Sequence, residues 1–204
     1  LELDAEQIEV HVALGNFHYL TGKYSAAKES FHKALALVPT SSEAIMGLAQ
    51  TLVSNNETDE AEKLYLGLIE EQPNLWMPHN FLAGLYLKLG RIEDAIPMLK
   101  KTIQISPGNA SGYTNLGTAY YYLGETKLAI EYWQTSLLYQ EDADVYSNIA
   151  TIYYQNSQFE KAVSLFAKAA ELAPSFAIYR GNLADALYFD GQVPQAKKAY
   201  SKAI

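Results

Sequence analysis

The chain has 204 residues, of which 49% are apolar and 19% are charged, so it can bury a substantial core and is not an intrinsically disordered segment. Its formal net charge of −8 argues against nucleic acid as a partner, because phosphate binding needs clustered Lys and Arg. The absence of Cys excludes disulfides and thiolate chemistry, and the absence of a long apolar run predicts no membrane span. This composition favours a cytoplasmic location, and a periplasmic one stays open.

The spacing of the prolines reveals an internal period. Pro39, Pro73 and Pro107 are 34 residues apart, and Pro174 follows 67 residues later, close to two further periods. On the same period, an aliphatic residue is followed by Gly or Ala, which predicts the first helix of each repeat. In chain order these pairs are Leu14-Gly15, Leu48-Ala49, Leu82-Ala83, Leu116-Gly117, Ile149-Ala150 and Leu183-Ala184.

A turn and a second helix are predicted after each pair. The turn residues are Gly22, Asn56, Gly90, Gly124, Ser157 and Gly191. An Ala then precedes a large side chain by one helical turn, at Ala27/Phe31, Ala61/Tyr65, Ala95/Leu99, Ala129/Trp133, Ala162/Phe166 and Ala196/Tyr200. The small residues allow helices to approach closely, and the large side chains fill the remaining space. Tyr86, Tyr120, Trp133, Tyr153 and Phe166 fall on the packed faces and are predicted core residues.

This pattern resembles the tetratricopeptide repeat, a 34-residue helix–turn–helix with the same order of Leu-Gly, Tyr, Ala, Phe and Pro. The resemblance covers essentially the whole chain, because all the copies keep phase. It implies an all-α fold, a right-handed superhelical α-solenoid of antiparallel helix pairs, as a single solenoid over residues 1–204. The predicted repeats are 8–41, 42–75, 76–109, 110–142, 143–176 and 177–204, and residues 1–7 match the tail of a preceding repeat.

The fourth and last repeats depart from this pattern. The fourth is one residue short and has Glu141 where Pro is expected, so the loop before the fifth repeat should have a different shape. In the last repeat, Ala196, Ala199 and Ala203 line a face suited to a following helix. We therefore expect a segment of a longer polypeptide, or an end covered by another molecule, for example in a homodimer.

A second stripe on the first helices is the candidate binding surface. On a helical wheel, Tyr120 falls on the packed face, whereas Thr118 and Tyr121 fall beside it. First helices line the concave inner surface of tetratricopeptide solenoids, so the resemblance implies that this stripe faces a groove. The candidate residues are Asn115, Thr118, Tyr121, Asn148, Thr151, Tyr154, Asn182, Asp185 and Tyr188. The first three repeats place a more apolar set there, including Val12 and Met46.

These residue types suit an extended peptide. An Asn amide offers donors and an acceptor to a peptide backbone, and Tyr adds contact area at low entropic cost. The Asn series resembles the asparagine ladder in the tetratricopeptide superhelix of O-linked N-acetylglucosamine transferase, at half its length. The equivalent places in the first three repeats hold Ala13, Gly47 and Phe81. We predict a non-enzymatic protein–protein interaction scaffold that binds an extended peptide or a partner helix, with ordinary solvated surface as the alternative.

A second hypothesis is a regulatory or oligomerisation segment of a larger bacterial signalling protein, such as a kinase, a cyclase or a transcriptional regulator. Residues 181–187 and 199–204 show a short resemblance to repeats that accompany such domains.

No pattern in the sequence predicts catalysis, a metal or another cofactor. His11 and His18 lie on a predicted packed face without a carboxylate to complete a ligand set, and His79 is also expected to pack. No Ser/His/Asp arrangement or phosphate-binding loop follows from the spacing. Pro97 is predicted to distort or delay the second helix of the third repeat, whereas Pro194 lies at a helix start.

Overall fold

The computed structural model describes residues 2–201, and their side chains from Gln7 onward. This described part is helical, with no strand, and holds twelve helices. In chain order they are α1 (Glu2–Leu20), α2 (Tyr24–Leu37), α3 (Ser42–Ser54), α4 (Thr58–Glu71), α5 (Trp76–Lys88), α6 (Ile92–Ile105), α7 (Ala110–Tyr122), α8 (Thr126–Leu137), α9 (Ala143–Gln155), α10 (Phe159–Leu172), α11 (Ala177–Phe189) and α12 (Val193–Ser201). The predicted all-α class is confirmed.

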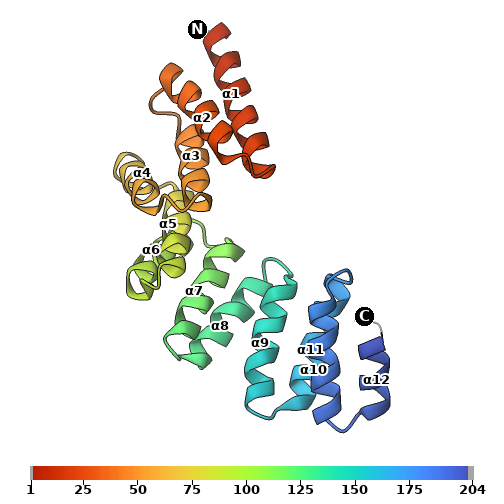
Figure 1. Ribbon diagram of the computed structural model, residues 1–204. Coiled ribbons are helices and arrows are strands. Elements are labelled where there is room, and N and C mark those ends of the chain that lie inside the picture. Colours follow the sequence, from red (N-terminus) through yellow and green to blue (C-terminus); the bar gives the residue numbers. More distant parts are fainter. Residues whose placement is uncertain (1, 202–204) are drawn as a thin grey trace. The chain divides into compact units, whose positions relative to one another are not determined.

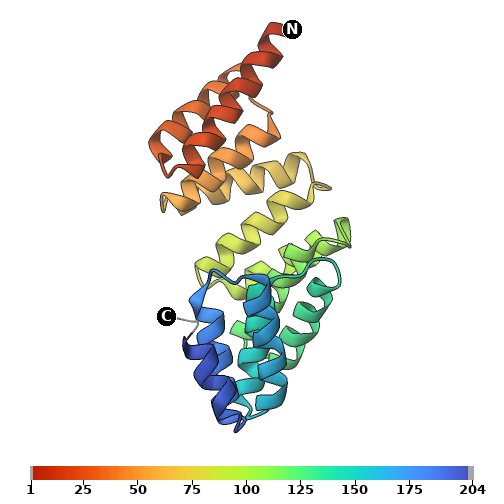
Figure 2. The same cartoon turned by 90° about the vertical axis from the view of Figure 1, so that its right-hand side faces the viewer.

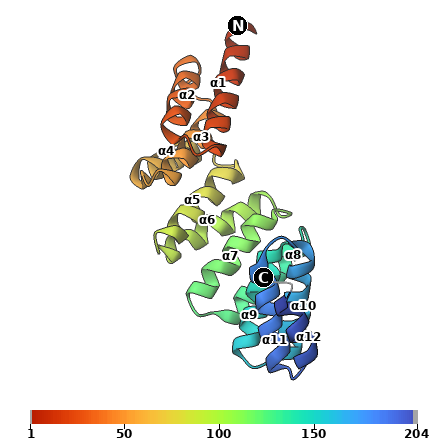
Figure 3. The same cartoon turned by 45° about the vertical axis from the view of Figure 1, so that its right-hand side comes forward.

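The helices fall into two compact units, Leu1–Pro107 and Gly108–Ile204. In the first unit, which holds α1 to α6, every two consecutive helices are in contact. Helix α3 also contacts both α1 and α5 (Figures 1 and 2). In the second unit, which holds α7 to α12, every two consecutive helices are also in contact. Helices α9 to α12 therefore lie side by side (Figures 1 and 3). Each unit therefore holds three consecutive helix pairs. That both belong to a single solenoid stays a prediction.

The predicted repeats match the helix boundaries closely. Helices α3, α5, α7, α9 and α11 begin at residues 42, 76, 110, 143 and 177, where the predicted repeats begin. At the N-terminal end, α1 already begins at Glu2, so residues 2–7 continue into the helix that holds Gly15. No Pro or Gly interrupts that stretch. The predicted boundary between residues 7 and 8 therefore lies inside a helix.

At the C-terminal end, Ala203 lies outside the described residues. Association of two copies through the C-terminal end stays a prediction.

The six predicted turn residues all have a positive φ. Four of them are glycines, for which this conformation costs little. The other two are Asn56, with a φ of 63°, and Ser157, with a φ of 58°. Asn tolerates the left-handed region better than Ser does, because its short amide can bond locally. Ser157 is therefore the most strained of the six turn residues.

The loop before α9 has the different shape that the short repeat predicted. The residues that follow α2, α4, α6 and α10 leave the helical region, with φ values of −134°, −132°, −131° and −128°. Leu138 after α8 is helical instead, with a φ of −69°. The chain then reaches Asp142, whose carboxylate accepts hydrogen bonds from the N–H groups of Asp144 and Val145 at 2.8 and 3.1 Å. This cap defines the start of α9 without a proline.

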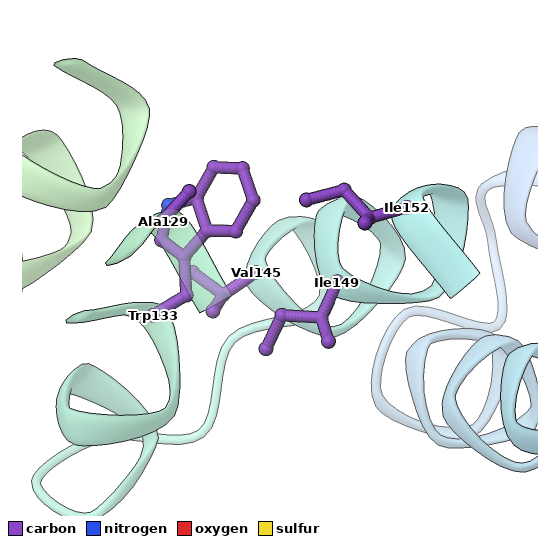
Figure 4. Close-up of a cluster of buried hydrophobic side chains, with 5 residues drawn as sticks. All are labelled: Ala129, Trp133, Val145, Ile149 and Ile152. Atoms are coloured by element: carbon purple, nitrogen blue, oxygen red, sulfur yellow. The ribbon is translucent and has the colours of Figure 1, made fainter. Parts of the chain in front are cut away.

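Large side chains of the second helices pack against small residues of the first helices. Phe31 of α2 is fully buried and lies where a methyl group on Gly15 of α1, or on Gly47 of α3, would have to be. Trp133 of α8 lies in the same way against Gly117 of α7. Figure 4 shows Trp133 and Ala129 of α8 gathered in one buried cluster with Val145, Ile149 and Ile152 of α9. The bulky Trp133 side chain therefore fills the space between α8 and α9.

Two of the five predicted core residues need a correction. Trp133, Phe166 and Tyr86 are buried, as predicted. Tyr120 and Tyr153 are only half-buried and pack against the core clusters from outside, since a Tyr side chain combines an apolar ring with a polar hydroxyl that favours water. Tyr120 stacks on Tyr132 of the same repeat, with ring centroids 5.4 Å apart.

The two prolines differ in their effect. Pro97 lies inside α6, but α6 begins at Ile92 and continues to Ile105, so the expected delay of this helix is wrong. The start of α6 is set by its first turn, which precedes Pro97. The N–H group that Pro97 lacks removes only one backbone hydrogen bond of the helix. Pro194 is the second residue of α12, as predicted.

Candidate functional site

Most of the candidate residues line three hollows in the second unit. We name each hollow by its asparagine. The Asn148 hollow, about 130 Å³, is lined by Thr118, Tyr121, Tyr122, Trp133, Asn148 and Thr151. The Asn182 hollow, about 250 Å³, is lined by Thr151, Tyr154, Gln155, Phe166, Asn182 and Asp185. The Asn115 hollow, about 260 Å³, is lined by Ala110, Ser111, Thr114, Asn115, Gln140 and Asp142. The remaining candidate, Tyr188, is exposed and lines none of them.

The Asn148 hollow combines a rigid aromatic wall with a free amide. The Trp133 indole donates its N–H to the carbonyl oxygen of Thr114 at 3.0 Å, and the Tyr121 ring lies 5.7 Å from the Trp133 ring. Asn148 itself is exposed, and its amide makes no hydrogen bond to any residue that the structure describes. Its donors and its acceptor are therefore available to another molecule.

The two threonines of this hollow present acceptors rather than donors. The Thr118 hydroxyl donates to the carbonyl oxygen of Thr114 at 3.0 Å, one turn back in α7. The Thr151 hydroxyl donates to the carbonyl oxygen of Ser147 at 2.8 Å in α9. Each hydroxyl has a single proton, so its remaining capacity is to accept. An N–H group of a bound chain is the complementary partner.

The Asn182 hollow contains a carboxylate among aromatic rings. Asp185 accepts a hydrogen bond from the Tyr200 hydroxyl of α12, and Tyr154 and Phe166 form the hollow's aromatic walls. The pKa of Tyr200 is raised mainly by that hydrogen bond. The pKa of Tyr154 is raised by burial and then by the negative charge of Asp185. Asn182 is half-buried here, and the structure gives its amide no hydrogen bond within the described chain.

An aromatic cluster of α9, α10 and α11 holds the Tyr154 ring in place. Tyr154 meets Phe159 and Phe189 edge-on, with ring centroids 5.5 and 5.8 Å apart. Phe159 and Phe189 stack on each other at 5.6 Å, and Tyr188 meets Phe189 edge-on at 5.5 Å. Sequence reasoning missed Phe159, although one signal was present. An aromatic residue five places after the groove tyrosine also follows Tyr19, where Tyr24 lies 6.1 Å from the Tyr19 ring.

The Asn115 hollow is more polar. Asn115 is half-buried in it, beside Thr114 and Ser111 of the same helix. Asp142 lines the opposite edge, but its carboxylate already accepts the two N–H groups at the start of α9. This hollow therefore offers less unused hydrogen-bonding capacity than the other two.

The first unit has a different hollow at the equivalent places. It measures about 620 Å³ and is lined by Asn16, Ser42, Glu43, Met46, Gly47, Gln50, Gln72, Leu75, Met77 and Phe81. An Asn cannot replace Gly47 here, because Phe31 occupies the space of its Cβ. Phe81 instead stacks on Tyr65, with ring centroids 6.4 Å apart. Val12, predicted at this surface, is buried with 3% of its side chain exposed, so that expectation is wrong.

Three of the four histidines, His11, His18 and His79, are at least half-buried, and His32 is exposed. His79 is 4% exposed, and its Nε2 lies 3.2 Å from the carbonyl oxygen of Pro73. Its burial lowers the pKa of the imidazole. The Nδ1 atoms of His11, His18 and His79 are buried and have no hydrogen-bond partner among the described residues. Within residues 2–201, no three His, Asp or Glu side chains converge in a metal-binding arrangement.

The described helices include none with both the length and the apolar character needed to cross a membrane.

Three family models match the sequence. Residues 18–77 and 114–177 match models described as tetratricopeptide repeat, and residues 84–124 match one described as TPR repeat. Among curated relatives, human protein O-mannosyl-transferase TMTC1 is 28% identical over 88% of this chain. Anaphase-promoting complex subunit 6 of Arabidopsis thaliana is 24% identical over 83%. The matched regions cover 21% and 32% of those two proteins, so this chain corresponds to only part of each.

Solved structures show the same fold. A thermophilic TPR protein of Thermus thermophilus, TTC0263, is 26% identical and matches with a TM-score of 0.76 over 89% of this chain and 99% of its own. PilF of Pseudomonas aeruginosa is 20% identical, with a TM-score of 0.84 over 98% and 90%. The Cut9–Hcn1 hetero-tetramer of the APC/C is matched with a TM-score of 0.77. The predicted similarity to bacterial signalling proteins is not borne out by these matches.

Proposed function

Because this chain belongs to the tetratricopeptide repeat family, whose members are generally protein–protein interaction scaffolds, we propose that it is a non-enzymatic scaffold that binds an extended peptide segment of a partner protein. The segment lies along the first helices of the second unit, over the Asn148 and Asn182 hollows. The candidate residues of those hollows are its contacts.

One observation carries this proposal. The amides of Asn148 and Asn182 lie one repeat apart on α9 and α11, line neighbouring hollows that share Thr151, and have no hydrogen bond of their own within the described chain. Neither amide therefore adds an internal hydrogen bond to the fold, and the donors and acceptor of each are accessible to a ligand. Two free amides and two hydroxyl acceptors instead match the alternating N–H and C=O groups of an extended backbone.

The aromatic side chains supply the rest of the contact energy. Tyr121 and Trp133 form one wall, and Tyr154 forms the next, each held by ring contacts within the unit. A ring that is already held in place loses little entropy when a ligand packs against it. The fold is typical of non-catalytic scaffolds, and none of the residues in these hollows forms a nucleophile–base pair that would support an enzymatic role.

Binding of peptides selected from a random peptide library on the purified chain tests the proposal. We expect Asn148→Ala and Tyr154→Ala each to weaken a selected peptide by roughly threefold to tenfold, the loss of one net hydrogen bond or one ring contact. Gln134→Ala on α8 is the matched control, since Gln134 is exposed and lines none of the hollows. It should bind as the wild type does. Fluorescence polarisation gives the affinities, and circular dichroism shows that each variant is folded.

The proposal is wrong if no selected peptide is sensitive to either groove substitution. It is also wrong if Gln134→Ala weakens binding as much as Asn148→Ala does, because binding would then not depend on the hollows.

A further inference from the structure

Asp185 is a carboxylate without a cationic partner among the described residues. Some other acids of the chain are paired with a cation, such as Glu57 with Lys28 at 2.6 Å and Glu62 with Arg91 at 2.9 Å. Within the described chain, the Asp185 carboxylate instead meets only the neutral hydroxyl of Tyr200. One hydrogen bond leaves most of its acceptor sites unused, and its full negative charge faces the Asn182 hollow.

The first helices around the hollows carry few charges. Helix α7 contains no charged residue, and α9 contains only Asp144. Helix α11 contains Arg180 besides Asp185, but the Arg180 guanidinium donates to the carbonyl oxygen of Pro174, before the helix begins. Among the described residues that line the three hollows, the charged ones are acids. The hollows therefore present a negative potential to a ligand.

Aromatic rings surround the same carboxylate. Tyr154 and Phe166 line the hollow with Asp185, and the Tyr154 ring contacts the rings of Phe159 and Phe189 edge-on. Burial, and then the negative charge of Asp185, raise the pKa of Tyr154, as expected for a hydroxyl in the same hollow as that carboxylate. A cation is attracted both by a carboxylate and by the face of an aromatic ring, whereas an anion is repelled by both.

We propose that the Asn182 hollow binds the cationic side chain of a Lys or Arg in the partner peptide, with Asp185 as its counter-ion and Tyr154 as its aromatic wall. This inference rests on the proposed function above and names the chemistry of the partner. The hollow's volume of about 250 Å³ accommodates a long aliphatic stem. The Asn182 carbonyl and the Thr151 lone pairs are available to further N–H groups of the cation. A neutral side chain would desolvate Asp185 without replacing its lost water contacts.

The experiment compares one peptide in two charge states. Peptides selected from the random library should share a Lys or Arg at one position. A synthetic peptide with Lys there is compared with the same peptide carrying Nε-acetyl-lysine, which keeps the stem and removes the charge. We expect acetylation to weaken binding to the wild type by roughly threefold to thirtyfold, the range of one cation–π contact with a nearby counter-ion.

Asp185→Asn should show a clearly smaller acetylation penalty than the wild type, because the counter-ion is lost and only the Tyr154 ring still favours the charged peptide. Glu131→Gln removes the same charge from an exposed place on α8 outside the hollows and should retain the full acetylation penalty. Circular dichroism confirms that both variants are folded.

Two results would overturn the inference and leave the proposed function standing. The first is that the selected peptides depend on Asn148 for binding but do not share a Lys or Arg. The second is that acetylation weakens binding to Asp185→Asn as much as binding to the wild type, since the cation would then be recognised by residues other than Asp185. If no peptide depends on Asn148 or Tyr154, the proposed function and this inference fail together.

Discussion

Substituting Gly117 by Ala tests how the second unit is packed. A methyl group at this position would lie 2.5 Å from Cδ1 and 2.7 Å from Nε1 of Trp133, well inside van der Waals contact. The indole cannot move freely, because its N–H is bonded to the carbonyl oxygen of Thr114 at 3.0 Å and the side chain is buried against α9. Either the ring shifts and loses that bond, or α7 and α8 separate.

The magnitude follows from these contacts. Overpacking a core site costs about 1–3 kcal/mol, and displacement of the indole also loses a hydrogen bond worth about 0.5–1.5 kcal/mol. Ala is favoured over Gly inside a helix by about 1 kcal/mol, which offsets part of the cost. We therefore expect a net loss of about 1–3 kcal/mol in the free energy of unfolding. Urea denaturation followed by circular dichroism measures it.

Gly67→Ala is the matched control. Gly67 lies inside α4, and a methyl group there would meet no atom within 4 Å. Only the helix-propensity gain remains, so this variant should be more stable than the wild type by about 0.5–1 kcal/mol. The reasoning is refuted if Gly117→Ala is as stable as the wild type. A second check is the Trp133→Leu background, in which the cost of Gly117→Ala should largely disappear.

Three further changes have defined outcomes. Ser157→Gly should stabilise the chain by about 0.5–1 kcal/mol, because Ser157 has a φ of 58°; an unchanged urea midpoint would contradict the assigned strain. Asp142→Ala should cost about 1 kcal/mol through loss of the cap of α9, whereas Asp142→Ser should retain most of the stability; equal losses would rule out the cap. Burial lowers the pKa of His79 below its value in the unfolded chain, so the unfolded state binds the proton more readily. The free energy of unfolding should therefore be highest above about pH 6.5 and decrease as the pH drops below that value. In His79→Gln this decrease should be smaller when the urea midpoints at about pH 7.5 and about pH 5 are compared. A parallel fall in wild type and variant would exclude His79 as the cause.

The repeat period and the turn residues were accessible from the sequence alone. Helix starts at Ser42, Trp76 and Ala143 were predicted from spacing, because an apolar pattern of helical period and its turn are local properties of the chain. Ser157 was assigned to a turn by its place in the repeat, although Ser rarely adopts a positive φ, and the structure shows that φ. Agreement among the copies made such assignments possible where a single segment would not have sufficed.

The placement of the candidate residues on the first helices also followed from the sequence, since a helix turns by a constant angle per residue. Their contacts did not. The Phe31 ring against Gly47, the Phe159 ring against Tyr154 and the Tyr200 hydroxyl on Asp185 each join side chains from different helices. Which rotamers fit together depends on the distance and angle between those helices.

The sequence by itself therefore determined the class of fold, the phase of its helix pairs and the surface on which the asparagines lie. Only the tertiary structure decided that Trp133 and Phe166 line the hollows, and that Asp185 has no cation beside it within the described part of the chain. The physical reason is that periodicity acts along one chain segment, whereas cavities and unpaired charges arise from packing between segments that the sequence pattern does not position.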